Sequence, residues 1–321
     1  VTAGTLASLS NSVFASLGLS GVSDELGIGG STSGRECIVL IDGMGSKLIT
    51  EYGKEFPIFS QSIFEKELSS HFPTTTTVNL TSLATGVLPG IHGMLGYTVR
   101  VPRSGEPGRL LNALKWDERV DPLIWQNVPT LFERASAEGI STSQISAKRY
   151  EDTGFTRAAL RGAKYVGANL ISEISDEAAK VLKKEKSFAY VYINHLDVAG
   201  HEDGVGSEKW LLAMAKVAKL LTELKEKLPI GTRVWVTADH GMVNADEIII
   251  LGKDNDLNKD VTLYGGEPRA RHLYVRSGAE SDVISRYRSN LGPRAEVLSK
   301  EDAISKNLFG DKMSMDSKER I

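Results

Sequence analysis

Three apolar runs place the strongest limit on what this chain can fold into. They lie within residues 36–42, 187–197 and 232–241. Continuous apolar runs of this length, bounded by glycines or polar residues, are typical of strands that are buried on both faces of a parallel sheet. Amphipathic helical segments lie between the runs. The sequence therefore predicts a single α/β domain over residues 1–321, with a doubly wound, mostly parallel central sheet and helices on both faces.

Each of the three runs ends at an acidic residue, namely Asp42, Asp197 or Asp239. The carboxyl ends of parallel strands share one edge of a sheet, and ligands bind at that edge. Carboxylates that cluster there repel one another unless a cation lies among them. His201 follows Asp197 by four residues, and His240 adjoins Asp239. Mixed carboxylate and imidazole ligands indicate zinc or a similar divalent ion.

A hydroxyl-rich stretch, HFPTTTTVNLTSLATG, spans residues 71–86 and predicts a helix that starts among the threonines and ends at Gly86. The N-terminus of a helix carries unpaired N–H groups and favours anions such as phosphate. A threonine there can be a simple N-cap, or it can attack phosphorus with its hydroxyl group. The stretch alone leaves both interpretations open for each of its four consecutive threonines.

Composition and charge exclude several classes of function. The net charge of −3 gives no excess of basic residues with which to bind a nucleic-acid polymer. The single cysteine, Cys37, allows neither an intramolecular disulfide nor a cysteine-based metal site. No apolar run reaches membrane-spanning length, and residues 1–19 predict a short amphipathic helix without the charged region of a signal peptide. We therefore expect a cytoplasmic protein without a membrane partner.

Residues 98–128 are rich in proline, glycine and tryptophan and show no clear period. They predict a small, irregular, cap-like insertion, with a hairpin around residues 109–116 that lies over the edge of the sheet. Further along the chain, residues 248–251 and 270–276 indicate short strands, and residues 281–292 indicate a helix.

Four sequence blocks occur in order and together resemble a known family. They are IVLIDGMG (38–45), FPTTTTVNLTSLATGVLPGIHGMLGY (72–97), YINHLDVAGH (192–201) and TADHGM (237–242). The sequence resembles the alkaline phosphatase superfamily, and within it the type I phosphodiesterase/nucleotide pyrophosphatase branch. The resemblance implies an alkaline-phosphatase-like fold and two divalent metal ions, with zinc as the first choice and manganese or iron as alternatives.

The resemblance also implies roles for individual residues. One metal ion would be held by Asp42, Asp239 and His240, and the other by Asp197 and His201. The nucleophile matches the hydroxyl ten residues before Gly86, which is Thr76, and Thr76 also counts among the metal ligands. Thr75 and Thr77 remain alternatives, because the choice depends on the alignment.

Two positions depart from the pattern of the family. Tyr97 stands where nucleotide-cleaving members have an asparagine that contacts a phosphate oxygen, so Tyr97 is a candidate substrate-binding residue. A third histidine ligand is expected for the ion of Asp197 and His201, and His272 is the only histidine after His240. His272 is either that ligand or a residue that fills a strand.

The resemblance implies a two-metal hydrolase that cleaves phosphodiester or phosphoanhydride bonds in a small-molecule phosphate ester or nucleotide, through a phospho-threonine intermediate. One alternative is a phosphomonoesterase, phosphonate hydrolase or phosphomutase of the same superfamily. The other is a metal-binding protein with impaired catalysis, which the uncertain third histidine favours.

Overall fold

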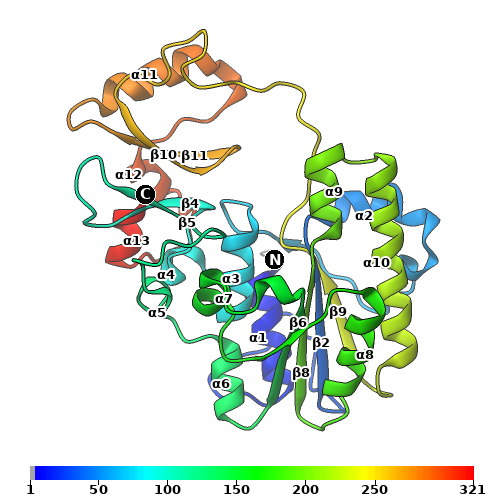
Figure 1. Cartoon of the computed structure of the whole chain (residues 1–321). Coiled ribbons are helices and arrows are strands. Elements are labelled where there is room, and N and C mark those ends of the chain that lie inside the picture. The colour runs from blue at the N-terminus through cyan, green and yellow to red at the C-terminus, as the bar shows by residue number, and fades with distance from the viewer. Residues whose placement is uncertain (1–3) are drawn as a thin grey trace.

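A five-stranded parallel sheet forms the centre of the molecule, in a computed structural model that describes residues 4–321 (Figure 1). The strand order is β7-β6-β8-β2-β9, and every neighbouring pair is parallel. The strands are β2 (Arg35–Ile41), β6 (Ser141–Ser146), β7 (Lys164–Gly167), β8 (Ser187–Ile193) and β9 (Arg233–Thr237). Two short strands, β1 (Gly4–Thr5) and β3 (Leu68–Ser69), pair in parallel beside this sheet.

The central strand β2 is buried on both faces, which explains its unbroken apolar sequence. Side chains alternate along a strand, so Ile38 and Leu40 belong to the core on one face of the sheet. Cys37, Val39 and Ile41 belong to the core on the other face. The burial of Cys37 agrees with its prediction as a small apolar residue.

Helices cover both faces of the sheet (Figure 1). The first core contains residues from α1 (Leu6–Ser16), α3 (Thr76–Thr85) and α6 (Leu131–Ala137). The second contains residues from α2 (Ser46–Tyr52), α8 (Ile171–Val181), α9 (His195–Asp203) and α10 (Glu208–Lys227). The expected doubly wound α/β fold is confirmed. In the described part of the chain, no helix combines the length and the apolar character that crossing a membrane requires.

The second predicted strand is shorter than expected, and this changes how its acidic residue is placed. β8 ends at Ile193, and Asp197 lies in the first turn of α9 instead of at the end of a strand. His201 lies one turn further along the same helix, since residues four positions apart share a helical face. The spacing of DVAGH is therefore a helical spacing.

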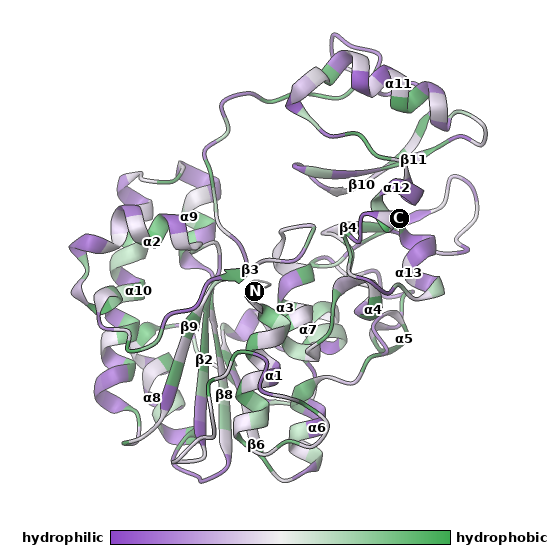
Figure 2. Cartoon of the chain, turned by 180° about the vertical axis from the view of Figure 1, so that it is seen from behind, coloured by the Kyte–Doolittle hydropathy of each residue, from purple (hydrophilic) through white to green (hydrophobic). Residues whose placement is uncertain are grey.

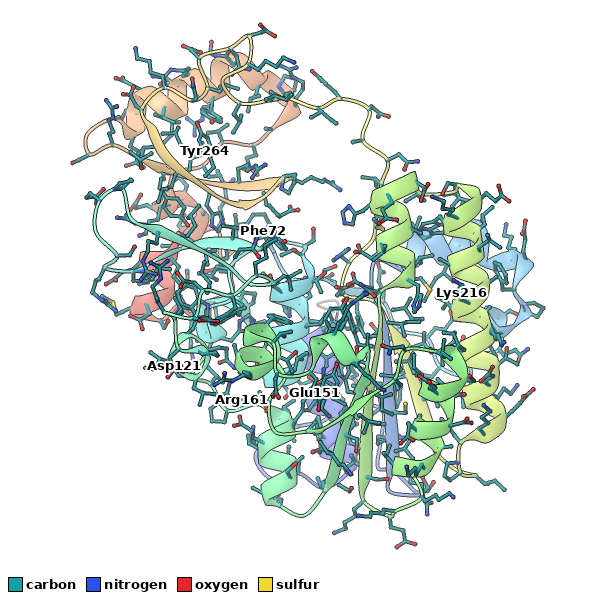
Figure 3. The ribbon with its side chains drawn as sticks, in the orientation of Figure 1. Phe72, Asp121, Glu151, Arg161, Lys216 and Tyr264 are labelled. Carbon is teal, nitrogen blue, oxygen red and sulfur yellow. The ribbon has the colours of Figure 1, made fainter. Side chains whose placement is uncertain are left out.

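The predicted insertion belongs to a larger second lobe. A hairpin is present, but it is formed by β4 (Thr98–Val101) and β5 (Arg109–Asn112) and so begins earlier than the predicted hairpin around residues 109–116. These strands join β10 (Val261–Glu267) and β11 (Ala270–Val275) in a four-stranded antiparallel sheet of order β11-β10-β4-β5. α11 (Glu280–Leu291) packs on β10 and β11 through a small apolar core. Figure 2 shows this lobe from behind, above α3, and Figure 3 shows Tyr264 of β10 within it.

Local sequence patterns predicted the secondary structure incorrectly in two places. Residues 248–251 form no strand but an exposed connection in which Ile248 is 81% exposed, so that prediction was wrong. The edge strand β7 was not predicted, because it is short and only partly buried. The remaining helices are α4 (Pro89–His92), α5 (Pro122–Trp125), α7 (Gly154–Ala159), α12 (Lys300–Ser305) and α13 (Met315–Arg320). Four 3-10 helices complete the structure: η1 (Gly53–Glu55), η2 (Pro57–Ser60), η3 (Lys148–Tyr150) and η4 (Gly292–Arg294).

A buried carboxylate joins the edge strand β9 to β2. Glu36 is fully buried, and its two oxygens accept hydrogen bonds of 2.7 Å from Arg233 Nε and from Trp235 Nε1. Ser16 Oγ of α1 donates a third at 3.2 Å. These bonds satisfy a charge that would otherwise be costly to bury. They also fix β9 beside β2, and the two strands lead to two of the acidic residues described below.

Glu36→Leu should lower the free energy of unfolding by about 2–3 kcal/mol, because it leaves the Arg233 and Trp235 donors without their acceptor. Urea denaturation measures this loss. Glu36→Gln serves as the matched control, since it keeps the shape of the side chain and one acceptor oxygen, and it should lose less. Equal stability of Glu36→Leu and the wild type would contradict this account of the edge strand.

Candidate active site

Two neighbouring strands bring two acidic residues to one edge of the sheet. Asp42 directly follows β2, and Asp239 comes two residues after the end of β9. Because β2 and β9 are parallel neighbours, both carboxylates lie at the carboxyl edge. Asp42 is 2% exposed and Asp239 is fully buried. The fold therefore places two acidic side chains in an environment of low polarity.

A third acidic residue and a histidine complete this group. One ligand atom from each of Asp42, Asp197 and His240 lies within 4.8 Å of the others. His240 Nε2 lies 3.3 Å from Asp42 Oδ1 and 3.6 Å from Asp239 Oδ2. Asp239 Oδ1 accepts hydrogen bonds from the backbone N–H groups of Gly43, at 3.1 Å, and His240, at 3.0 Å. These bonds turn Asp239 Oδ2 toward the histidine.

The donor atoms of this group fit a divalent cation. Asp239 Oδ2 and Asp197 Oδ1 are shielded from solvent and accept no hydrogen bond within residues 4–321. Buried carboxylate oxygens almost always have a partner, so two orphaned oxygens beside an imidazole indicate that a partner of another kind belongs there. Oxygen and imidazole ligands of this kind suit zinc and also manganese or iron.

The pKa values of these side chains are shifted by burial and by the charges of their neighbours. Burial raises the pKa of Asp42 well above its usual range, and the charge of Asp239 raises it further. Burial and the charge of Asp42 raise the pKa of Asp197 to about 6. Burial alone would lower the pKa of His240, but the charges of Asp239 and Asp42 raise it. Without a cation, these groups retain protons that the ionised ligand set would have to lose.

Among the four threonines, Thr76 is the one whose hydroxyl reaches this group. It is the first residue of α3, and its Oγ1 lies 3.4 Å from each carboxylate oxygen of Asp42 and 3.2 Å from His240 Nε2. Thr75 is the N-cap residue, and Thr77 is buried with its Oγ1 donating to the carbonyl of Gly96 at 3.1 Å. The hydroxyl of Thr76 therefore lies at the N-terminus of a helix, against an acid and an imidazole.

Asn79 holds the start of α3 in place. It is fully buried, and its Oδ1 accepts a hydrogen bond of 2.8 Å from the backbone N–H of His71. Its Nδ2 donates to the carbonyl of Thr75 at 3.2 Å. The other end of the helix stops at Gly86, whose left-handed backbone (φ of 70°) favours glycine. Both ends of the predicted helix agree with the sequence analysis.

The two remaining histidine candidates differ in position. His201 Nε2 lies 3.4 Å from Asp197 Oδ1, and its side chain is 72% exposed. His272 lies on β11, in the second lobe, with its ring packed edge-on against Phe309 at 6.3 Å. Burial lowers the pKa of His272 to about 4, and neither ring nitrogen has a hydrogen-bond partner in the described chain. His272 is not among the side chains gathered around Asp42, so its role as a ligand stays a prediction.

Tyr97 lies at the start of the β4–β5 hairpin of the second lobe. It directly precedes β4, and its carbonyl accepts a hydrogen bond of 2.9 Å from the backbone N–H of Ala113. Its neighbour Gly96 is the residue that receives the hydroxyl of Thr77. The residue next to Tyr97 thus contacts the first turn of α3, and the contact of Tyr97 with a substrate stays a prediction.

Tyr192 is a site residue that sequence reasoning missed. Its hydroxyl donates a hydrogen bond of 2.5 Å to Asp42 Oδ2, across the β2–β8 pair. Burial raises the pKa of Tyr192, and the charge of Asp42 raises it further, so the phenol keeps its proton and remains a donor. The only signal in the sequence was a tyrosine near the end of an apolar strand, and its partner depends on a strand register that local patterns do not reveal.

Added Zn²⁺ or Mn²⁺ should raise the melting temperature, and the increase should grow as the pH rises through about 6. The sign follows from Asp197, whose pKa of about 6 is raised. At pH values above the pKa that this carboxyl has in the unfolded chain, its ionisation lowers the free energy of unfolding of the metal-free protein. A cation that binds the ionised carboxylate removes this loss. Thermal unfolding at about pH 5 and about pH 7.5 measures the effect.

Asp42→Asn tests whether this increase arises at the site, since it removes one buried ligand. The increase should disappear in that variant and persist in Asp246→Asn, which changes an exposed acid outside the group. An equal increase at both pH values, or the same increase in Asp42→Asn, would show that the cation binds elsewhere.

Comparisons with known proteins identify the family and the fold of this chain. The family model of type I phosphodiesterase/nucleotide pyrophosphatase matches residues 37–320. A solved structure of murine ectonucleotide pyrophosphatase/phosphodiesterase 5, an inactive threonine-to-alanine variant in complex with AMP, is 16% identical with a TM-score of 0.67. That match covers 87% of this chain and 75% of the murine chain.

The human protein of the same name is 17% identical with a TM-score of 0.65, covering 87% of this chain and 76% of that one. At these identities, the structural matches show a shared fold. A search of the curated proteins found no significant match.

Proposed function

The chain belongs to the type I phosphodiesterase/nucleotide pyrophosphatase family, and from that premise we propose that it hydrolyses phosphodiester or phosphoanhydride bonds of nucleotide-like small molecules. The observation that carries the proposal is the hydroxyl of Thr76, at the start of α3 and in contact with Asp42 and His240. A helix N-terminus favours a phosphoryl group, and the neighbouring ligand set favours cations that offset its charge.

The proposal assigns the metal ligands as the family resemblance does. Asp42, Asp239 and His240 hold one divalent cation, with Thr76 beside it, and Asp197 and His201 contribute to a second. The orphaned oxygens of Asp239 and Asp197 support this assignment. When bound, such cations lower the pKa of a nearby hydroxyl group and offset charge on the phosphoryl oxygens.

The hydroxyl of Thr76 then serves as the nucleophile. Its Oγ1 forms a bond to phosphorus while the bond from phosphorus to the leaving oxygen breaks, and the leaving group departs with that oxygen. The proton of the hydroxyl passes to solvent, past the acceptor atoms of Asp42 and His240. The intermediate is a phospho-threonine that keeps the second substituent of the substrate on phosphorus. Attack by water on this phosphorus breaks its bond to Oγ1, releases the phosphate monoester, and returns a proton from water to the hydroxyl of Thr76.

A structural neighbour supports both the nucleophile and the substrate class. In the murine protein, the threonine-to-alanine variant is inactive and holds AMP. A protein of the same fold thus loses its activity when one threonine is replaced by alanine, and it binds AMP. For this chain, nucleotide-like substrates are the corresponding proposal.

A phosphomonoesterase, phosphonate hydrolase or phosphomutase is the second candidate. Tyr97 favours it, because a phenol stands where nucleotide-cleaving members have an asparagine. Comparing the rates with p-nitrophenyl phosphate and with bis-p-nitrophenyl phosphate separates the two candidates. Faster turnover of the monoester would favour the second.

Thr76→Ala should reduce turnover of bis-p-nitrophenyl phosphate, in the presence of Zn²⁺ or Mn²⁺, by about a thousandfold or more, because it removes the nucleophile. Thr74→Ala is the matched control, since Thr74 is exposed and precedes the helix. It should retain the activity of the wild type. Undiminished turnover by Thr76→Ala would contradict the assignment of the nucleophile.

A further inference from the structure

The side chain of Met242 lies between the segments that carry the candidate metal ligands. It belongs to the segment that follows β9, and it is partly buried against the apolar core that contains α9. A Cβ atom on Gly43, the residue after Asp42, would lie 2.9 Å from Met242 Sδ and 3.1 Å from its Cγ. A Cβ atom on Gly200, the residue before His201, would lie 2.6 Å from both Sδ and Cε of Met242. The thioether therefore occupies the space that side chains at positions 43 and 200 would need.

This close contact accounts for a glycine within a helix. Non-bonded carbon atoms attract one another most strongly at about 3.5–4.0 Å, so a methyl group on Gly200 would overlap the thioether of Met242. Gly43 has a left-handed backbone (φ of 75°), which favours glycine by itself. Gly200 lies within α9 and has no such backbone, and glycine is less favourable than alanine in a helix. The approach of Met242 is thus the feature of the structure that requires glycine at position 200.

Two further contacts hold the segment that carries Met242. On one side, a Cβ atom on Gly45 would lie 2.7 Å from the Cα atom of Gly241, so the two backbones lie against each other. On the other side, Asn244 Oδ1 accepts a hydrogen bond of 2.8 Å from the backbone N–H of Val205, and Asn244 Nδ2 donates to the Val205 carbonyl at 3.1 Å. Val205 comes directly after the C-cap residue of α9. The segment is therefore fixed between the loop after β2 and the end of α9.

The position of Met242 matters because the ligands assigned to the two cations lie on different segments. Those of one cation follow β2 and β9, whereas Asp197 and His201 lie on α9. Two-metal sites hold their ions about 3.5–4 Å apart, so such a site requires a fixed distance between helix and strand ends. A Cβ atom on Gly43 would lie 3.4 Å from the Cβ atom of Asp197. Thus α9 meets the loop after β2 at Gly43, where the thioether of Met242 also lies.

We propose that Met242 is a positioning residue that sets the distance between the metal ligands on α9 and those that follow β2 and β9. This inference rests on the proposed two-cation hydrolase, and it names the side chain that links the two cation sites. Met242 belongs to the block TADHGM (237–242), in which the family resemblance assigned roles only to Asp239 and His240.

Gly200→Ala tests this role without removing a side chain from the core. The added methyl group should displace the flexible end of the Met242 side chain, because both need the same space. The melting temperature of the metal-free protein should change little, since alanine is favoured over glycine within a helix. Titration calorimetry should nevertheless show that Zn²⁺ binds about tenfold more weakly at Asp197 and His201. The binding event that disappears in His201→Ala identifies this site.

Met242→Ala and the double variant test whether the two positions act through one contact. Met242→Ala should also weaken binding of Zn²⁺ at this site about tenfold. In Gly200→Ala/Met242→Ala, the added methyl group enters space that the thioether has left, so binding should be no weaker than in Met242→Ala. Additive losses, which would amount to about a hundredfold, would show that the two positions act independently and would overturn the proposal.

Met214→Ala is the matched control for the loss of a methionine. Met214 is fully buried in the same apolar core, on α10, which carries none of the candidate ligands. This variant should lower the melting temperature but leave the affinity for Zn²⁺ unchanged. Weakening as large as that in Met242→Ala would show a general effect of stability and would overturn the proposal. Unchanged affinity in both Met242→Ala and Gly200→Ala would overturn it directly.

Calorimetry with Zn²⁺ requires no turnover, so it separates this proposal from the proposed hydrolase function. Selective weakening at Asp197 and His201, in a chain that hydrolyses no phosphate ester, would refute the hydrolase and retain the positioning role. Hydrolysis by the wild type, together with unchanged affinity in the Met242 and Gly200 variants, would refute the positioning role and retain the hydrolase. Binding of only one zinc ion by the wild type would overturn both the proposal and the assignment of two cations.

Discussion

The mutual repulsion of three acidic side chains at one edge of the sheet is the constraint on which the rest of the site depends. Asp42, Asp197 and Asp239 follow β2, lie on α9 and follow β9, and the burial of Asp42 and Asp239 removes the solvent that would screen their charges. Such a group is unfavourable unless protons or cations neutralise it. The raised pKa values of Asp42 and Asp197 reflect neutralisation by protons. The carboxylate oxygens without a hydrogen-bond partner indicate neutralisation by cations.

The surrounding structure maintains this unfavourable arrangement. Glu36, with its donors Arg233 and Trp235, fixes β9 beside β2, and the apolar cores on both faces fix the parallel strands. Asn79 holds the start of α3, so the hydroxyl of Thr76 stays in contact with Asp42 and His240. Stability elsewhere in the fold thus supports a local cluster that is costly by itself.

The sequence predicted the parts of this site that depend on local patterns. The ends of apolar strands predicted Asp42, Asp239 and His240 at one edge, and the pattern that ends at Gly86 predicted a helix that starts among the threonines. The choice of Thr76 among them came from the family resemblance. The contact of Tyr192 with Asp42 depends on strand register, and the pairing of β10 with β4 joins segments that are far apart in the chain. Neither leaves a local signal, and the same is true of the position of His272 in the second lobe.

Anomalous diffraction at the zinc edge, from crystals soaked with Zn²⁺ and orthovanadate, tests the central claim most directly. The account predicts a peak between Asp42, Asp239 and His240, and a second beside Asp197 and His201. It also predicts vanadium within bonding distance of Thr76 Oγ1. Zinc bound only away from the carboxyl edge, or vanadate bound away from Thr76, would contradict the account.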